Sequence, residues 1–146
     1  MRRVFLLCCT AALVGCYGSR EEAGEADEAA TMSLADMAGK WAMQTMAEAS
    51  DSVIVSYEMN ATATTEGWTM TLPNREPVSL HIVPGGDSVI THGGPYESVL
   101  RPGVTVTTES TTRLVDGVLQ GWVVARYQGA GADSVMRFRV RGTRAP

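Results

Sequence analysis

The sequence predicts an all-β domain, a small antiparallel up-and-down meander of about eight strands that closes into a barrel. From Trp41 onward, apolar and polar residues alternate with a period of two. Clusters of Gly, Pro, Asn and Asp separate these short runs, and the segment 104–115 is rich in Thr and Val. Because hairpin-connected strands must protect their edges, a barrel or a sandwich follows. Another small barrel or a β-sandwich is therefore the alternative fold.

A short helix is expected before the first strand. Ser33 has the form of an N-cap, with the acidic Asp36 three residues later, and Gly39 ends the helix after one or two turns. The strands then follow in ranges separated by turn residues. They are expected at 41–46, 52–63, 67–72, 78–83, 87–92, 104–115, 117–128 and 133–144.

Two local signals place turns between these strands. Asp116-Gly117 is a residue pair that accepts positive φ, so it predicts a tight two-residue hairpin. The tripeptide Asp-Ser-Val occurs three times, beginning at Asp51, Asp87 and Asp133. Each copy is interpreted as a turn followed by the start of a strand, with the valine as the first strand residue.

The first 16 residues contain all three cysteines of the chain, Cys8, Cys9 and Cys16. Arg2 and Arg3 precede a continuous apolar stretch at 4–14 that is too short to span a bilayer, which needs roughly 20 residues. This layout predicts a secretory signal over residues 1–15.

The residues Leu13-Val14-Gly15-Cys16 resemble the lipobox of bacterial lipoproteins. The resemblance implies that the Cys16 thiol carries a diacylglycerol and that the chain is cut just before it. Acyl chains at Cys16 would then anchor the protein to a membrane. An ordinary secretory signal with an incidental Cys16 is the alternative.

Residues 16–32 are expected to be a disordered acidic linker after the lipidated cysteine, because five acids mixed with Ala and Gly provide no apolar face to bury. The domain at 33–146 has nine basic and eleven acidic residues and no cysteine. This balance gives no reason to expect a nucleic-acid partner.

Gly39-Lys40-Trp41, after a short helical turn, resembles the G-x-W motif of lipocalin and other calycin barrels. The resemblance implies that an arginine of the last strand packs over Trp41 and closes the base of the barrel. Arg137, Arg139 and Arg141 are the candidates. These three arginines share one face of that strand, and an outward, solvated face is expected because buried unpaired charges are costly.

The irregular segment 91–103 holds the candidates for a ligand site at the mouth of the barrel: Tyr96, Glu97 and Arg101. Trp68 and Trp122 are further candidates, as aromatics of the core or of the cavity lining.

Ser98 and His92 suggest a nucleophile and a base, but the G-x-S-x-G elbow and a third partner are missing, so no catalytic residue is expected. His81 and His92 stand 11 residues apart without a pattern of carboxylates, so neither a metal site nor a cofactor is expected.

The sequence therefore favours a non-enzymatic lipoprotein of the cell envelope whose barrel binds a small apolar or amphipathic molecule. The alternative is a structural lipoprotein with a filled core that docks onto an envelope protein. A cavity of about 300 Å³ or more would favour the first function. Tyr17 after the cysteine is not the aspartate that retains some lipoproteins in the inner membrane. The outer membrane, facing the periplasm, is accordingly the expected location.

Overall fold

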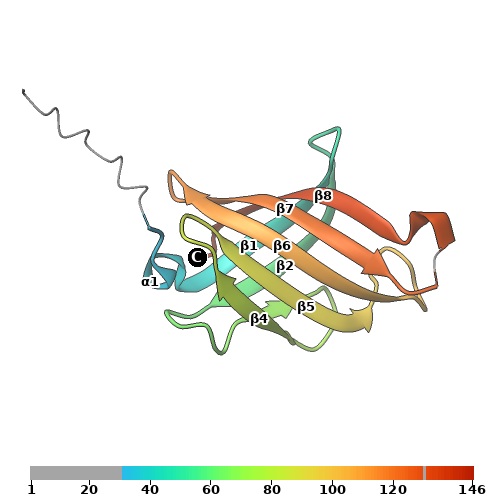
Figure 1. The fold of residues 1–146 in the computed structure, drawn as a ribbon, viewed down its shortest axis with the longest axis horizontal. Coiled ribbons are helices and arrows are strands. Elements are labelled where there is room, and N and C mark those ends of the chain that lie inside the picture. The colour runs from blue at the N-terminus through green and yellow to red at the C-terminus, as the bar shows by residue number, and fades with distance from the viewer. Residues whose placement is uncertain (1–30, 130) are drawn as a thin grey trace, which may run out of the picture.

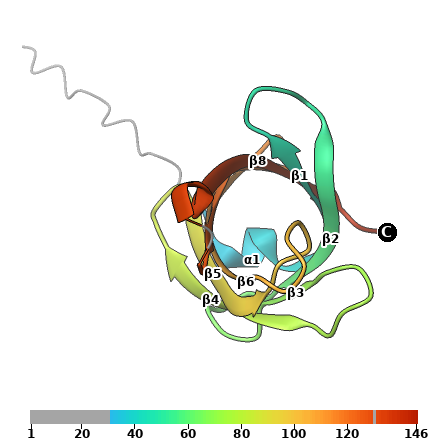
Figure 2. The same cartoon turned by 90° about the vertical axis from the view of Figure 1, so that its right-hand side faces the viewer.

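The computed structural model describes residues 31–129 and 131–146, and it contains a closed barrel of eight antiparallel strands (Figures 1 and 2). Each strand pairs with the next, and the last strand pairs with the first, so the described barrel has no open sheet edge. This confirms the predicted fold, and the chain forms a lipocalin-like barrel. The strands are β1 (Gly39–Ala47), β2 (Val53–Ala61), β3 (Thr69–Thr71), β4 (Val78–Pro84), β5 (Val89–Glu97), β6 (Thr105–Val115), β7 (Val118–Tyr127) and β8 (Val135–Arg144).

The predicted turn and helix signals are confirmed. Ser33 accepts a hydrogen bond from the backbone N–H of Ala35 and caps the single-turn helix α1 (Leu34–Met37). Asp116 and Gly117 have φ of 51° and 77°, and they join β6 to β7 as a two-residue hairpin. The strands β2, β5 and β8 begin at the valines of the three Asp-Ser-Val copies.

One expectation about the strands is wrong. The segment 91–103 was expected to be an irregular connection, but β5 continues through it to Glu97. The pairing of β5 with β6 shifts register between Gly93 and Tyr96, which lets the strand pass Pro95 as a bulge. The connection is therefore confined to residues 98–104.

The two ends of the barrel differ. Helix α1 lies across one end, and Figure 2 looks through the barrel from the other end toward it. The connections β1–β2, β3–β4, β5–β6 and β7–β8 lie at the end opposite α1, and the last of them contains the 3-10 turn η1 (Gly131–Asp133). We call these the closed end and the open end.

The closed end is held by Trp41, which is completely buried. Its indole Nε1 donates a hydrogen bond to the carbonyl of Met37, 2.7 Å away, and so ties the barrel to α1. The guanidinium of Arg144 lies over the indole ring, 4.2 Å from its centroid. Arg144 also donates to the backbone carbonyls of Asp36 and Ala38.

An arginine of the last strand thus does pack over Trp41, but the expected candidates are corrected. Arg137 lies over Trp122 on the outer wall, and Arg139 donates to the carboxylate of Asp51, 2.7 Å away. Both belong to the outward face of β8, whose inward residues include Phe138 and Val140. Arg144 takes the position over Trp41 because it ends β8 directly opposite Trp41 on β1.

Candidate functional site

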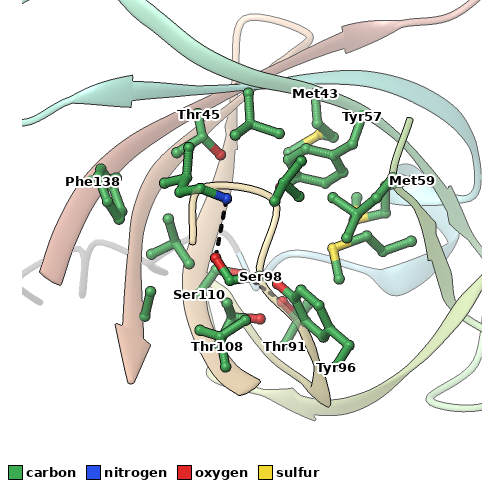
Figure 3. Close-up of a pocket in the computed structure, with 18 of the residues that line it drawn as sticks. Met43, Thr45, Tyr57, Met59, Thr91, Tyr96, Ser98, Thr108, Ser110 and Phe138 are labelled. Atoms are coloured by element: carbon green, nitrogen blue, oxygen red, sulfur yellow. Dashed lines mark hydrogen bonds between the residues drawn. The ribbon is translucent and has the colours of Figure 1, made fainter. Parts of the chain in front are cut away.

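The interior of the barrel contains a cavity of about 80 Å³ toward the open end (Figure 3). Every strand of the barrel contributes to its wall. The apolar part of the lining comes from Met43, Val55, Met59, Met70, Leu72, Leu80, Val99, Leu100, Val106, Val123, Ala125 and Phe138. Methionine side chains are flexible, so this part of the wall adapts to the shape of a ligand.

Hydroxyl groups form the polar part of the lining, and they come from Thr45, Tyr57, Thr91, Tyr96, Ser98, Thr108, Ser110, Thr112 and Tyr127. Thr91 and Ser110, which are partners on β5 and β6, hydrogen-bond to each other through their hydroxyls. No charged side chain is among the described residues that line the cavity. The wall therefore offers apolar contact and neutral hydrogen-bonding groups.

Burial affects the ionisation of two tyrosines in the cavity wall, Tyr57 and Tyr96. Burial raises the pKa of the Tyr57 phenol well above its usual range, and the neighbouring Tyr96 raises it further, while Thr45 acts in the opposite sense. Burial also raises the pKa of Tyr96, and the Thr108 hydroxyl partly offsets this. Both phenols stay neutral at physiological pH and act as donors or acceptors, not as charges.

The cavity is smaller than the volume expected for a carrier. Its 80 Å³ accommodates a few water molecules, whereas pockets for drug-sized ligands measure about 300–1,000 Å³. A larger ligand needs space that the connection 98–104 now occupies at the open end, since Val99 and Leu100 of this connection line the cavity. Those two side chains remain 36% and 38% exposed, so they are not locked into the core.

Ser98 shapes this connection. Its side chain is only 2% exposed, and its Oγ accepts hydrogen bonds from the backbone N–H groups of Leu100 and Arg101 at 3.1 and 3.0 Å. Two hydrogen bonds between residues farther apart in the sequence complete the loop: Glu97 accepts from the N–H of Gly103, and the Ser98 N–H donates to the carbonyl of Val104. Ser98 therefore serves as a turn-forming residue.

Two arginines attach this connection to its neighbours at the open end. Arg101 lies over the ring of Tyr127, 4.3 Å from its centroid, and donates to the carbonyl of Asp133 in η1. Arg75, from the β3–β4 connection, donates to the carbonyls of Glu97 and Ser98. These arginine contacts add to the hydrogen bonds of Ser98 in holding the loop.

The predicted ligand residues are distributed as follows. Tyr96 lines the cavity, while Glu97 and Arg101 hold the β5–β6 connection and do not line the cavity. Trp68 is buried at the closed end, with its indole Nε1 donating to the carbonyl of Thr64 at 2.7 Å. Trp122 is 36% exposed on the outer wall beneath Arg137. Neither tryptophan lines the cavity: Trp68 belongs to the core, the other alternative named for it, whereas Trp122 belongs to neither the core nor the lining.

Ser98 and His92 are not brought together. Ser98 lines the interior cavity, whereas His92 lies on the outer face of β5, with its Nδ1 3.7 Å from a carboxylate oxygen of Glu109. Within residues 31–129 and 131–146, no group of three or more His, Cys, Asp or Glu side chains could hold a metal ion.

Sequence reasoning missed the hydroxyl groups of the cavity. Thr108, Ser110 and Thr112 alternate along the Thr-rich strand β6 and line the cavity, but residues 107–113 are polar at every position. The sequence therefore gives no signal for which of the two faces points inward.

None of the described helices is long and apolar enough to cross a membrane. No known protein family, curated protein or solved structure matches this chain.

Proposed function

We propose that this protein is a lipid-anchored component of the bacterial cell envelope whose barrel binds a small amphipathic molecule at its open end. The observation that carries the binding part is the composition of the cavity wall. Methionines and aliphatic residues face a set of neutral hydroxyls, and none of the cavity-lining residues in the described chain is charged. Such a wall favours a ligand with a short apolar part and a neutral polar group.

The proposal includes no catalytic step. The one buried serine at the cavity, Ser98, has an oxygen that already accepts two backbone hydrogen bonds, and His92 points to the outside of the barrel. A nucleophile needs a base within hydrogen-bonding reach, and these two residues lie on different faces of the wall.

The limited volume supports a second candidate, a structural lipoprotein with a filled barrel that docks onto an envelope protein. A cavity of 80 Å³ is smaller than the engineered cavity of about 150 Å³ that takes up benzene. In the first candidate, the ligand displaces Leu100 and Val99 outward. In the second, these side chains stay where they are.

A fluorescence titration with the neutral probe N-phenyl-1-naphthylamine distinguishes the two candidates. Ala125 lines the cavity and is 4% exposed, so Ala125→Phe fills the space. The neighbouring Val124 lies on the other face of β7, so Val124→Phe is the matched control. We expect saturable binding to the wild type, at least tenfold weaker binding to Ala125→Phe, and no change for Val124→Phe.

Native mass spectrometry of the purified protein provides a second readout, through the mass of a co-purified small molecule. If the probe does not bind and no small molecule co-purifies, the ligand-binding function is refuted and the structural lipoprotein with a filled barrel is supported. If Ala125→Phe and Val124→Phe weaken the probe equally, the probe binds on the surface and the cavity site is refuted.

The anchor is tested separately, because Cys16 lies outside the described residues. Cys16→Ser should move the protein from the membrane fraction to the soluble fraction, while Cys9→Ser should leave it on the membrane. Density-gradient separation then decides whether the wild type sits in the outer membrane. A Cys16→Ser protein that stays on the membrane would refute the lipid anchor.

A further inference from the structure

Arginines gather on one part of the outer wall, where the neighbouring strands β6, β7 and β8 form a continuous surface (Figure 1). Arg113 on β6 and Arg141 on β8 are both direct cross-strand partners of Gln120 on β7. These three residues are exposed and form one row across the three strands. Two further arginines of β8, Arg137 and Arg139, lie on the same outer face.

A groove of about 450 Å³ lies over this part of the wall, and we call it the arginine groove. Its lining includes three of the four arginines together with an amide and an exposed indole: Arg113, Arg139, Arg141, Gln120 and Trp122. None of the residues that line the arginine groove also lines the interior cavity. The groove is therefore separate from the proposed ligand site.

This wall has a surplus of positive charge, although the domain at 33–146 as a whole has more acidic than basic residues. Arg113 pairs with Asp87 at 3.4 Å, and Arg139 pairs with Asp51 at 2.7 Å. Among the described residues, no ion pair is found for Arg141 or for the fourth arginine of the wall. Four arginines thus face two carboxylates, and an anionic partner would complement them.

The chain enters the barrel beside the arginine groove. The backbone N–H of Met32 donates to the carbonyl of Gly86, 3.0 Å away, in the turn between β4 and β5. The next residue of that turn is Asp87, the ion-pair partner of Arg113. The segment that precedes Met32 therefore begins at the edge of the groove.

We propose that the acidic segment 21–28, which lies outside the described residues, docks on the arginine groove of its own chain. The segment contains five carboxylates, no basic residue and no apolar residue larger than alanine. It therefore has little apolar surface to bury, and charge-assisted hydrogen bonds to guanidinium groups are the strong contacts open to it. Such docking requires no helix or strand in the segment.

The length of the intervening chain permits this docking. Glu28 stands four residues before Met32 and Glu21 stands eleven before it. An extended chain covers up to about 13 Å over four residues and up to about 36 Å over eleven. Arg113 and Arg141 lie two strands apart, a distance of about 10 Å between their backbones. The acidic segment can therefore reach across the whole row.

Docking would shorten the link between the barrel and its anchor. If Cys16 carries the lipid proposed above, residues 16–20 remain as the tether, and five residues span at most about 17 Å. The wall formed by β6, β7 and β8 would then be held near the membrane. This consequence rests on the proposed anchor, whereas the docking itself does not.

The test is paramagnetic broadening in NMR spectra of the full chain, with its three cysteines replaced by serine and a nitroxide attached at Ala26→Cys. A docked segment should remove more than about half of the amide signal intensity at Gln120 and Arg141, relative to the reduced label. Val83 is the internal reference, because it is 39% exposed on β4 and lies just before the turn that binds Met32. Its amide signal should retain more intensity than the other two.

Variants then test the charges. Arg141→Gln removes an arginine of the groove and should bring the broadening at Gln120 down to the level at Val83. Arg126→Gln is the matched control, because Arg126 is an exposed arginine of β7 that does not line the groove, and it should leave the broadening unchanged. In 1 M NaCl the broadening at Gln120 should also fall, because the Debye length shortens to about 3 Å.

The acids of the segment provide a variant that does not alter the barrel. Amide replacements of all five should abolish the preferential broadening at Gln120 and Arg141, whether or not Arg141→Gln folds. The five positions are Glu21, Glu22, Glu25, Asp27 and Glu28.

Three results would overturn the proposal. One is equal broadening at Val83 and Gln120, which would mean that the segment does not favour the groove. Another is an equal effect of Arg141→Gln and Arg126→Gln, which would leave only a dependence on net charge. The third comes from a mixture of nitroxide-labelled chain with ¹⁵N-enriched chain that has no label. Broadening of the ¹⁵N signals at Gln120 in this mixture would place the segment on a second copy.

Discussion

Replacing Arg144 by alanine tests how the closed end of the barrel is held. The guanidinium lies 4.2 Å from the centroid of the fully buried Trp41 ring. It also donates to the backbone carbonyls of Asp36 and Ala38. Asp36 lies in α1, the only α-helix among the described residues, and Ala38 is the C-cap of that helix. Arg144→Ala removes all three contacts at once and leaves two carbonyls at the helix end without their donor.

The magnitude follows from these contacts. A cation over an aromatic ring contributes about 0.5–2 kcal/mol, and each net hydrogen bond contributes about 0.5–1.5 kcal/mol. Because Arg144 is exposed to solvent, the lower half of each range applies. We expect the free energy of unfolding to fall by about 2 kcal/mol, which lowers the melting temperature by about 6–12 °C in a domain of this size.

The assay is urea unfolding followed by tryptophan fluorescence, since all three tryptophans lie in the described barrel. Arg141→Ala is the matched control, because Arg141 lies on the outer face of the same strand and should change the unfolding free energy by less than about 0.5 kcal/mol. Arg144→Lys keeps the charge but loses the planar guanidinium, so its unfolding free energy should lie between those of Arg144→Ala and Arg141→Ala. Equal stability of Arg144→Ala and Arg141→Ala would refute the reasoning.

Three further predictions concern the wall and the open end. Gly121→Ala should lower the unfolding free energy by about 3 kcal/mol or more, because its Cβ would stand 1.9 Å from the carbonyl oxygen of Thr111. Tyr57→Phe should reduce the loss of stability above about pH 10. The raised pKa keeps folded Tyr57 protonated while the unfolded chain has already lost that proton, so stability is fully present below pH 10 and falls as pH rises. Ser98→Ala should cost about 1 kcal/mol, because two partly buried loop N–H groups lose their acceptor.

Each of these has a distinct measurement and a contrary result. If the free energy of unfolding of Gly121→Ala, measured with urea, lies within about 0.5 kcal/mol of the wild-type value, strands β6 and β7 make room for the added methyl group without strain. Equal slopes of stability against pH for wild type and Tyr57→Phe between pH 10 and 12 would show that the phenol is not desolvated. Hydrogen exchange should show faster exchange at Leu100 in Ser98→Ala, and unchanged exchange would exclude a capping role.

The local features of this fold could be predicted because they depend on neighbouring residues alone. Asp116-Gly117 makes a hairpin through its own backbone preferences, and Ser33 caps a helix through a bond two residues away. The extent of β5 could not be predicted in this way. Gly93, Gly94 and Pro95 have the composition of a loop, yet pairing with β6 resumes at Tyr96 and carries β5 past them, whereas the pairing with β4 ends at Gly93.

The residues of the candidate sites depend on which face of each strand points inward and on how neighbouring strands are aligned. The sequence of a single strand determines neither of these. Alternation shows that Trp122 and Val123 face opposite ways, but closure of the barrel decides that Val123 faces inward and Trp122 outward. For the same reason, the sequence indicated an arginine over Trp41 and named the wrong candidates.

By itself, the sequence determined the strand character, the order of the elements and the points where strands begin, because period-two alternation and turn chemistry act over a few residues. It also contains the lipobox-like segment on which the anchoring prediction rests. The tertiary structure alone decided that Arg144 closes the base, how little space remains in the interior, and that Arg113, Gln120 and Arg141 form one row. These depend on the cross-strand register of a closed barrel, which is set by all eight strands together.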